Sequence, residues 1–193
     1  MRQDRDMSIP NLLTLIRISL IPIFVLVFYL PFSWSPMATA VIFTLAALTD
    51  WLDGYLARKL KQVSPLGEFL DPVADKLIVA VALVLLVQAH GSALLAIPAA
   101  VIVCREIVIS ALREWMAEVG KRKTVGVSTL GKLKTAGQML SIILLLSQSP
   151  DKISLITILG YVFIYASAIL TLWSMVIYLK AAWRDLVHAE IPA

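Results

Sequence analysis

The sequence is poor in cysteine, histidine and charged residues, and each shortage excludes a class of protein. The single cysteine, Cys104, excludes a framework of internal disulfides. It lies within an apolar run, which fits a buried small residue better than a reactive thiol. His90 and His188 are too far apart to match a zinc-binding pattern. Charged residues make up only 16% of the chain, against about a quarter in soluble domains, so they are too few for a water-facing surface.

Apolar residues take the place of the missing charges. They make up 60% of the 193 residues, and the mean hydropathy is +0.87, so a lipid bilayer is the expected solvent. Six stretches approach the ~20 apolar residues that a membrane helix needs, and no internal repeat is visible. We therefore predict an all-α membrane protein with six transmembrane helices, forming one domain over residues 1–193. The predicted spans are Leu12–Leu30, Met37–Ala57, Phe69–Ala89, Ala93–Trp115, Lys132–Leu146 and Ser154–Leu179.

Lysine and arginine indicate the orientation. In a six-span arrangement nearly all of them lie on, or open toward, one side, and only Lys152 falls on the other. The positive-inside rule makes the basic side cytoplasmic, so both termini are predicted to face the cytoplasm. The net charge of +4 then reflects topology and anionic lipid, and no nucleic-acid partner is expected.

The ends of the predicted spans carry further signals. The first apolar run has no small-residue cleavage site after it, so we expect it to be retained as a span. The mixed polar and apolar segment Ile9–Arg17 is expected to begin as an N-terminal interfacial helix. Trp34, Tyr178 and Trp183 lie near span ends, where aromatic belts form.

Four aspartates form two helical pairs. Asp50 and Asp53 are spaced i, i+3, and Asp71 and Asp75 are spaced i, i+4, so each pair shares one helix face. The short connection predicts that the two helices are antiparallel neighbours, and we expect the four carboxylates to converge just inside the cytoplasmic boundary. Such a cluster is costly in a membrane unless cations neutralise it. Oxygen ligands favour Mg²⁺ or Mn²⁺, and two such ions can clamp a pyrophosphate.

The alternative is that these carboxylates are helix-end acids solvated at the interface. The residues between them favour a site instead. Gly54, Ala57 and Gly67 lie within about one turn of an aspartate and would let a flat ligand such as a nucleotide approach the backbone. Arg58 can bind a phosphate with its guanidinium fork.

These residues resemble the signature of the CDP-alcohol phosphotransferase family, D-x2-D-G-x2-A-R-x8-G-x3-D-x3-D, at every fixed position. The resemblance implies six membrane helices, a polar cavity facing the cytoplasm, a divalent-metal enzyme and, in many members, a homodimer. It implies that Asp50, Asp53, Asp71 and Asp75 bind metal and that Asp75 is also the general base. It also implies that the CDP-diacylglycerol site includes the following residues of the signature: Asp50, Asp53, Gly54, Ala57, Arg58, Gly67 and Asp71.

Further segments are similar to bacterial members of this family that use sn-glycerol 3-phosphate as the acceptor. They include Ile9–Thr14, Arg105–Trp115 and Gly131–Gln138. The resemblance implies transfer of the phosphatidyl group from CDP-diacylglycerol to sn-glycerol 3-phosphate, giving phosphatidylglycerol phosphate and CMP. The implied setting is the bacterial inner membrane, with membrane phospholipid around a multi-pass enzyme whose active site faces the cytoplasm.

A second polar cluster is basic. Basic groups at the start of a membrane span, or inside one, are costly unless something anionic meets them, and an acceptor phosphate would do so. We therefore predict that glycerol 3-phosphate binds Arg105, Arg113, Lys132 and Lys134. For the two lysines, extension of the side chain to the lipid headgroups is an equally good interpretation. Glu106 is expected to pair with a basic group if it has a structural role.

Two other functions are compatible with parts of this pattern. A member of the same family with another alcohol acceptor would keep the aspartates, and the basic cluster argues against serine but allows inositol phosphate. A cation transporter would use membrane carboxylates as ion ligands, but it predicts inverted repeats and acids near the bilayer midplane. The acids here lie at one end of their spans, which argues against transport.

Overall fold

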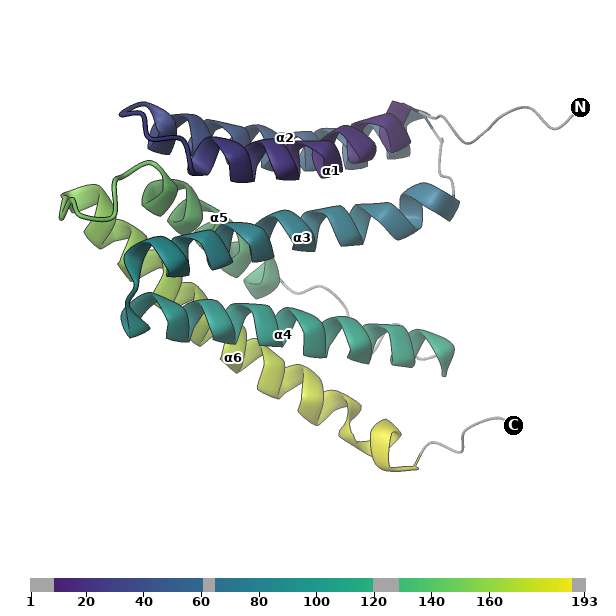
Figure 1. Cartoon of the computed structure of the whole chain (residues 1–193). Coiled ribbons are helices and arrows are strands. Elements are labelled where there is room, and N and C mark those ends of the chain that lie inside the picture. Colours follow the sequence, from purple (N-terminus) through teal and green to yellow (C-terminus); the bar gives the residue numbers. More distant parts are fainter. Residues whose placement is uncertain (1–8, 61–64, 120–128, 189–193) are drawn as a thin grey trace, which may run out of the picture. The chain divides into compact units, whose positions relative to one another are not determined.

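The structure is a computed structural model that describes residues 9–60, 65–119 and 129–188 (Figure 1). Side chains are described for residues 12–49, 67, 69–119 and 134–183. Within these ranges every regular element is an α-helix, as the apolar runs predicted. The six helices are α1 (Ile9–Phe28), α2 (Ser35–Leu60), α3 (Pro65–His90), α4 (Ala93–Glu118), α5 (Thr129–Leu146) and α6 (Leu155–His188).

Each predicted span coincides with one helix, but several helix ends differ. The helix α6 continues to His188, beyond the predicted end at Leu179. An apolar run marks the part of a helix that suits lipid, whereas backbone hydrogen bonding continues into the charged residues that follow. Residues 9–17 are continuous with the rest of α1, so the described residues contain no separate N-terminal helix. Their position at the membrane interface stays a prediction.

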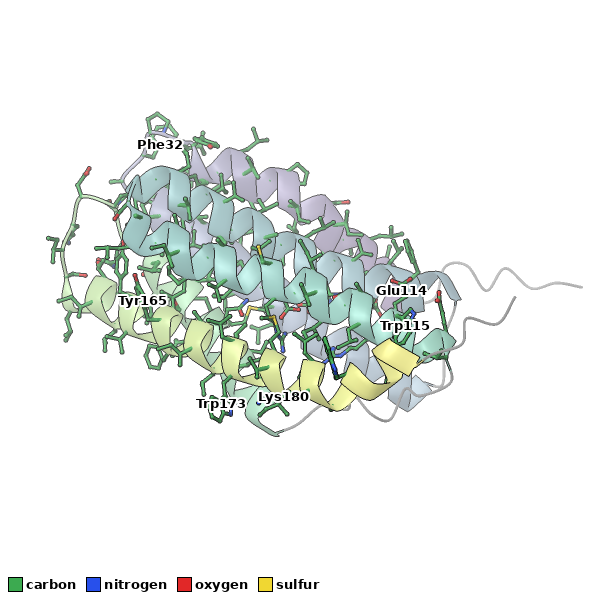
Figure 2. The ribbon with its side chains drawn as sticks, turned by 90° about the horizontal axis from the view of Figure 1, so that it is seen from below. Phe32, Glu114, Trp115, Tyr165, Trp173 and Lys180 are labelled. Atoms are coloured by element: carbon green, nitrogen blue, oxygen red, sulfur yellow. The ribbon has the colours of Figure 1, made fainter. Side chains whose placement is uncertain are left out.

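Two of the helices have stretches long and apolar enough to cross a membrane, Ala93–Glu118 and Leu155–Trp183. Shorter apolar helical stretches occur in α1, α2 and α5. Large apolar side chains are exposed along both candidate spans; Trp173, for example, is 67% exposed and projects from α6 in Figure 2. Cys104 is exposed on α4 as well, so the expectation that it is a buried small residue is wrong. Lipid is the natural environment for such faces, so the helices support a membrane protein, while the count of six spans stays a prediction.

The described helices group into two compact units. The first contains α1, α2 and α3 together with Ile142–Gly160, which is the hairpin between α5 and α6. The second contains Ser92–Ser141 and the remainder of α6 from Tyr161. The prediction of a single domain over residues 1–193 is not tested by this division and stays a prediction.

In the first unit, α1 packs against both α2 and α3, and α2 also contacts α3. Figure 1 shows α1 and α3 running in one direction and α2 in the other, so the predicted antiparallel arrangement of α2 and α3 is confirmed. Phe24 of α1 and Phe43 of α2 are fully buried, with their ring centroids 6.2 Å apart. This packing fixes α1 alongside the helices that carry the four aspartates.

Local signals explain where α3 and α4 begin and end. The helix α3 begins at Pro65, whose fixed φ suits the first helical position. It ends at His90, and the residue that follows, Gly91, has a φ of +54° that a side chain would strain. Ser92 then caps α4, because its hydroxyl accepts a hydrogen bond from the Leu94 amide at 3.2 Å. Gly91 and Ser92 therefore separate α3 from α4.

In the second unit, α4 and α6 share an apolar core. Ile109, Leu112 and Met116 of α4 pack with Tyr178 and Ala182 of α6, and all five are buried. The prediction that Tyr178 belongs to an aromatic belt is wrong, because this side chain is only 8% exposed within the core. Its position near the end of the apolar run was misleading, since α6 continues well beyond it.

Candidate active site

The first half of α3 carries a pair of carboxylates. Asp71 and Asp75 lie one turn apart on this helix, and both side chains are half-buried. Two carboxylates that share a helix face offer several oxygen atoms to one region, which is the ligand type that a hard divalent cation prefers. The two carboxylates are therefore partly accessible and lie one turn apart, while their role as metal ligands stays a prediction.

A hydroxyl from another helix orients one of these carboxylates. The Oγ1 atom of Thr14 in α1 donates a hydrogen bond to Oδ1 of Asp71 at 2.5 Å. The side chain of Thr14 is fully buried, as is that of Arg17 one turn further along α1. This contact was missed in the sequence because it joins residues 57 positions apart, which only the packing of α1 against α3 brings together.

The other half of the predicted carboxylate cluster lies on α2. Asp50, Asp53, Gly54, Ala57 and Arg58 belong to this helix, but their side chains fall outside the described residues. Among the side chains that are described, no three or more histidine, cysteine, aspartate or glutamate residues come together as a metal site. The four-carboxylate cluster therefore stays a prediction.

Gly67 is the remaining small residue of the signature. It lies in the first turn of α3 and is buried. It precedes Asp71 by one helical turn, so the two share a face of α3. Its proposed role toward a nucleotide stays a prediction.

The second unit holds a buried arginine with two partners. Arg105 of α4 is only 4% exposed, and its Nη1 atom pairs with Oε1 of Glu106 at 2.5 Å. Its Nη2 atom donates to the Ser174 hydroxyl of α6 at 3.4 Å. The structural alternative for Glu106, pairing with a basic group, is therefore observed. These partners hold the guanidinium in place, while its Nε atom has no hydrogen-bond partner among the described residues.

Lys134 of α5 is buried in the same unit. It is 6% exposed, and its ammonium has no hydrogen-bond partner among the described residues. Extension to the lipid headgroups would expose the ammonium, so the burial argues against that interpretation of Lys134. Arg113 differs from the buried Arg105 and Lys134, because its side chain is exposed on α4. Lys132 lies on α5 with its side chain outside the described residues.

Buried polar side chains on two helices accompany Lys134. Each set is spaced i, i+4, i+7 and so lies on one face of its helix. The close approach of the two helices is visible at Gly137, where an added Cβ would lie 3.0 Å from the Ser167 hydroxyl. This spacing is visible in the sequence, but serine and threonine also bond within their own helices and give a weak signal. The two sets are Lys134, Gln138 and Ser141 on α5, and Ser167, Thr171 and Ser174 on α6.

A cavity of about 140 Å³ lies in the first unit, at the end of α3 that is remote from the carboxylates. His90 lies at this end of α3, and its Nδ1 atom is 3.0 Å from the Leu86 carbonyl oxygen. The lining is mainly apolar, and none of it belongs to the predicted site. The lining residues are Phe28, Pro36, Leu86, Ala89, His90, Leu145, Leu146, Gln148 and Pro150.

The profile of the CDP-alcohol phosphatidyltransferase family matches residues 7–179, which is most of the chain and includes all four aspartates. The chain belongs to this family. Membership confirms the resemblance drawn from the aspartate signature. It also means that one family profile extends over residues of both structural units.

Individual members of the CDP-alcohol phosphatidyltransferase family are similar over nearly their whole length. A protein of Pseudomonas fluorescens is 59% identical over 181 residues, which cover 93% of this chain and 92% of the relative. A protein of Yersinia pestis (strain Pestoides F) is 54% identical, over 95% of this chain and 99% of the relative. A protein of Pectobacterium atrosepticum is 54% identical, over 94% of this chain and 98% of the relative. Each is named CDP-diacylglycerol–glycerol-3-phosphate 3-phosphatidyltransferase.

Proposed function

We propose that this chain transfers the phosphatidyl group from CDP-diacylglycerol to sn-glycerol 3-phosphate, giving phosphatidylglycerol phosphate and CMP. The observation that carries this function is the 54–59% identity to relatives named for that reaction, over more than nine-tenths of each chain. The enzyme is accordingly a transferase of phospholipid biosynthesis. Neither another acceptor alcohol nor cation transport is favoured by these relatives.

The carboxylates are proposed to bind divalent cations, Mg²⁺ or Mn²⁺, as a pair of ions. The ligands would be Asp50 and Asp53 of α2 with Asp71 and Asp75 of α3. The described pair fits this role, because both carboxylates are accessible oxygen donors and a hydroxyl donor orients one of them. When bound, such cations neutralise the pyrophosphate and stabilise charge at the reacting phosphorus.

The chemistry of the transfer is proposed to depend on Asp75 as the general base. This carboxylate takes the proton from the primary hydroxyl of glycerol 3-phosphate. The hydroxyl oxygen then attacks the phosphorus attached to diacylglycerol, and CMP leaves. Gly54, Ala57 and Gly67 are proposed to let the CDP moiety approach the helix backbones. Arg58 is proposed to bind the phosphates of CDP through its guanidinium.

The acceptor phosphate is proposed to bind the basic residues of the second unit. Arg105 belongs to this set because its guanidinium is buried and held in one place by Glu106 and Ser174. The buried ammonium of Lys134 supports the same role, because a buried charge without a hydrogen-bond partner is costly until an anion meets it. Arg113 and Lys132 complete the proposed set, and the exposure of Arg113 suits a residue that meets the acceptor as it enters.

The proposed setting is the bacterial inner membrane. The six helices are proposed to span the bilayer with both termini and the active site on the cytoplasmic side, as the distribution of lysine and arginine favours. A homodimer is proposed from the family resemblance. CDP-diacylglycerol would reach the site from the lipid of the cytoplasmic leaflet, with its acyl chains remaining in the bilayer.

The test is an acceptor panel with purified protein in lipid micelles. CDP-diacylglycerol and Mg²⁺ are supplied, and glycerol 3-phosphate, serine, inositol phosphate and phosphatidylglycerol are added one at a time while CMP release is measured. We expect CMP release with glycerol 3-phosphate and a phosphatidylglycerol phosphate product by mass spectrometry. Release with another alcohol in preference to glycerol 3-phosphate would contradict the proposal.

A further inference from the structure

The buried hydroxyl of Thr14 contacts a carboxylate of the candidate metal site. Thr14 belongs to α1, which carries none of the four aspartates. Its hydrogen bond to Oδ1 of Asp71 measures 2.5 Å, and the side chain of Thr14 is 0% exposed. A carboxylate offers about four lone-pair positions, so a hydroxyl on one oxygen still allows the group to bind a cation. The contact restricts which way the carboxylate faces.

The surroundings of Thr14 on α1 are polar as well as buried. Arg17 lies one turn further along the same face and is only 1% exposed. A threonine and an arginine would not be buried together on a face that packs only apolar side chains. This turn of α1 therefore faces a polar interior at the level of Asp71, and α1 packs directly against α3.

We propose that Thr14 is a positioning residue that holds the Asp71 carboxylate in the orientation needed to bind the divalent cation. The inference rests on the proposed function, because it gives Asp71 the role of a metal ligand. Hydrogen bonds to metal-binding carboxylates set ligand orientation, and loss of such a partner typically weakens metal affinity or activity about 10- to 100-fold. An interhelical hydrogen bond with only a structural role would change thermal stability and leave metal affinity unchanged.

The experiment compares Mn²⁺ binding to the purified full-length protein by electron paramagnetic resonance, with the metal alone as the probe. Thr14→Val removes the hydroxyl at nearly constant volume, and we expect its dissociation constant for Mn²⁺ to rise about 10-fold or more. Thr14→Ser retains the donor and should bind Mn²⁺ like the wild type. The metal concentration that half-saturates turnover should rise in parallel in Thr14→Val.

Thr39→Val is the matched control. Thr39 is also fully buried in the first unit, but its hydroxyl donates to the Ser35 carbonyl of its own helix at 2.7 Å. We expect this variant to bind Mn²⁺ like the wild type. An equal loss of affinity in both valine variants would overturn the proposal, because it would reflect general disturbance of the fold.

Asp71→Ala separates failure of this inference from failure of the proposed function. If the wild type binds Mn²⁺ and Asp71→Ala does not, while Thr14→Val binds normally, Asp71 is a ligand and the role of Thr14 is refuted alone. If the wild type and Asp71→Ala bind Mn²⁺ equally, or neither binds it, the metal site itself is refuted and the role of Thr14 with it.

Discussion

At the scale of single residues, the most informative feature is the set of polar side chains buried in a largely apolar molecule. Thr14, Arg105 and Lys134 are each less than a tenth exposed. Burial of such groups is costly, so they have to be held by partners or matched by a ligand. Arg105 has Glu106 and Ser174, whereas the ammonium of Lys134 has no hydrogen-bond partner among the described residues.

Replacement of Lys134 tests whether its ammonium binds the phosphate of the acceptor. We expect Lys134→Met to raise the KM for glycerol 3-phosphate about 30-fold, corresponding to about 2 kcal/mol for a hydrogen bond to a charged group. Thermal stability without substrate should stay the same or increase, because a buried charge is removed. Initial rates at varied acceptor concentration and thermal unfolding in detergent measure the two effects.

Lys180→Met is the control for that substitution. Lys180 is exposed on α6 (Figure 2) and lies outside the proposed site, so its replacement should leave the acceptor KM unchanged. A normal acceptor KM in Lys134→Met would show that this lysine does not bind the phosphate.

Residue types and spacing predicted a good part of the site. The signature gave the aspartates, and the position of Arg105 within a predicted span indicated its burial. The sequence could not decide between substrate binding and headgroup contact for Lys134, because both place a lysine at the start of a helix. It also could not indicate Thr14, since hydroxyl residues in membrane helices commonly bond to their own backbone.

At the scale of the helices, apolar runs predicted the number and position of the elements. They did not predict which face of each helix is buried, because a helix that is apolar all round shows no distinct core stripe. The core of α4 and α6 around Met116 and Tyr178 was therefore visible only in the structure. The sequence also did not indicate which glycines lie at close contacts between helices.

Gly160 allows the hairpin of α5 and α6 to close tightly in the first unit. A Cβ at this position would lie 2.7 Å from Cγ of Leu145, a side chain that is only 1% exposed and has little room to move. We expect Gly160→Ala to destabilise the protein by about 1–3 kcal/mol through overpacking. Thermal unfolding in one detergent measures the loss.

Gly137→Ala provides a graded comparison in the second unit. The nearest atom to its added Cβ is the Ser167 hydroxyl at 3.0 Å, a milder conflict than at Gly160. We expect a smaller loss of stability than in Gly160→Ala. Equal stability of Gly160→Ala and the wild type would contradict the close packing of the hairpin.

At the scale of the whole molecule, family membership and the close relatives establish what the sequence pattern predicted, a phosphatidyltransferase of the CDP-alcohol type. The distribution of basic residues adds a predicted orientation, and the apolar helices support a membrane setting. The joint action of all four aspartates involves side chains of α2 outside the described residues and stays a prediction of the signature.

The decisive measurement is the turnover of Asp75→Asn in lipid vesicles, followed as CMP release from CDP-diacylglycerol on addition of glycerol 3-phosphate with saturating Mg²⁺. Asparagine keeps the size of the side chain but cannot accept the proton, so we expect the rate to fall by about 10²- to 10⁴-fold while thermal stability is retained. Asp151→Asn, at an exposed position between α5 and α6, should turn over like the wild type. A wild-type rate in Asp75→Asn would contradict the proposed role of the carboxylate pair in phosphatidyl transfer.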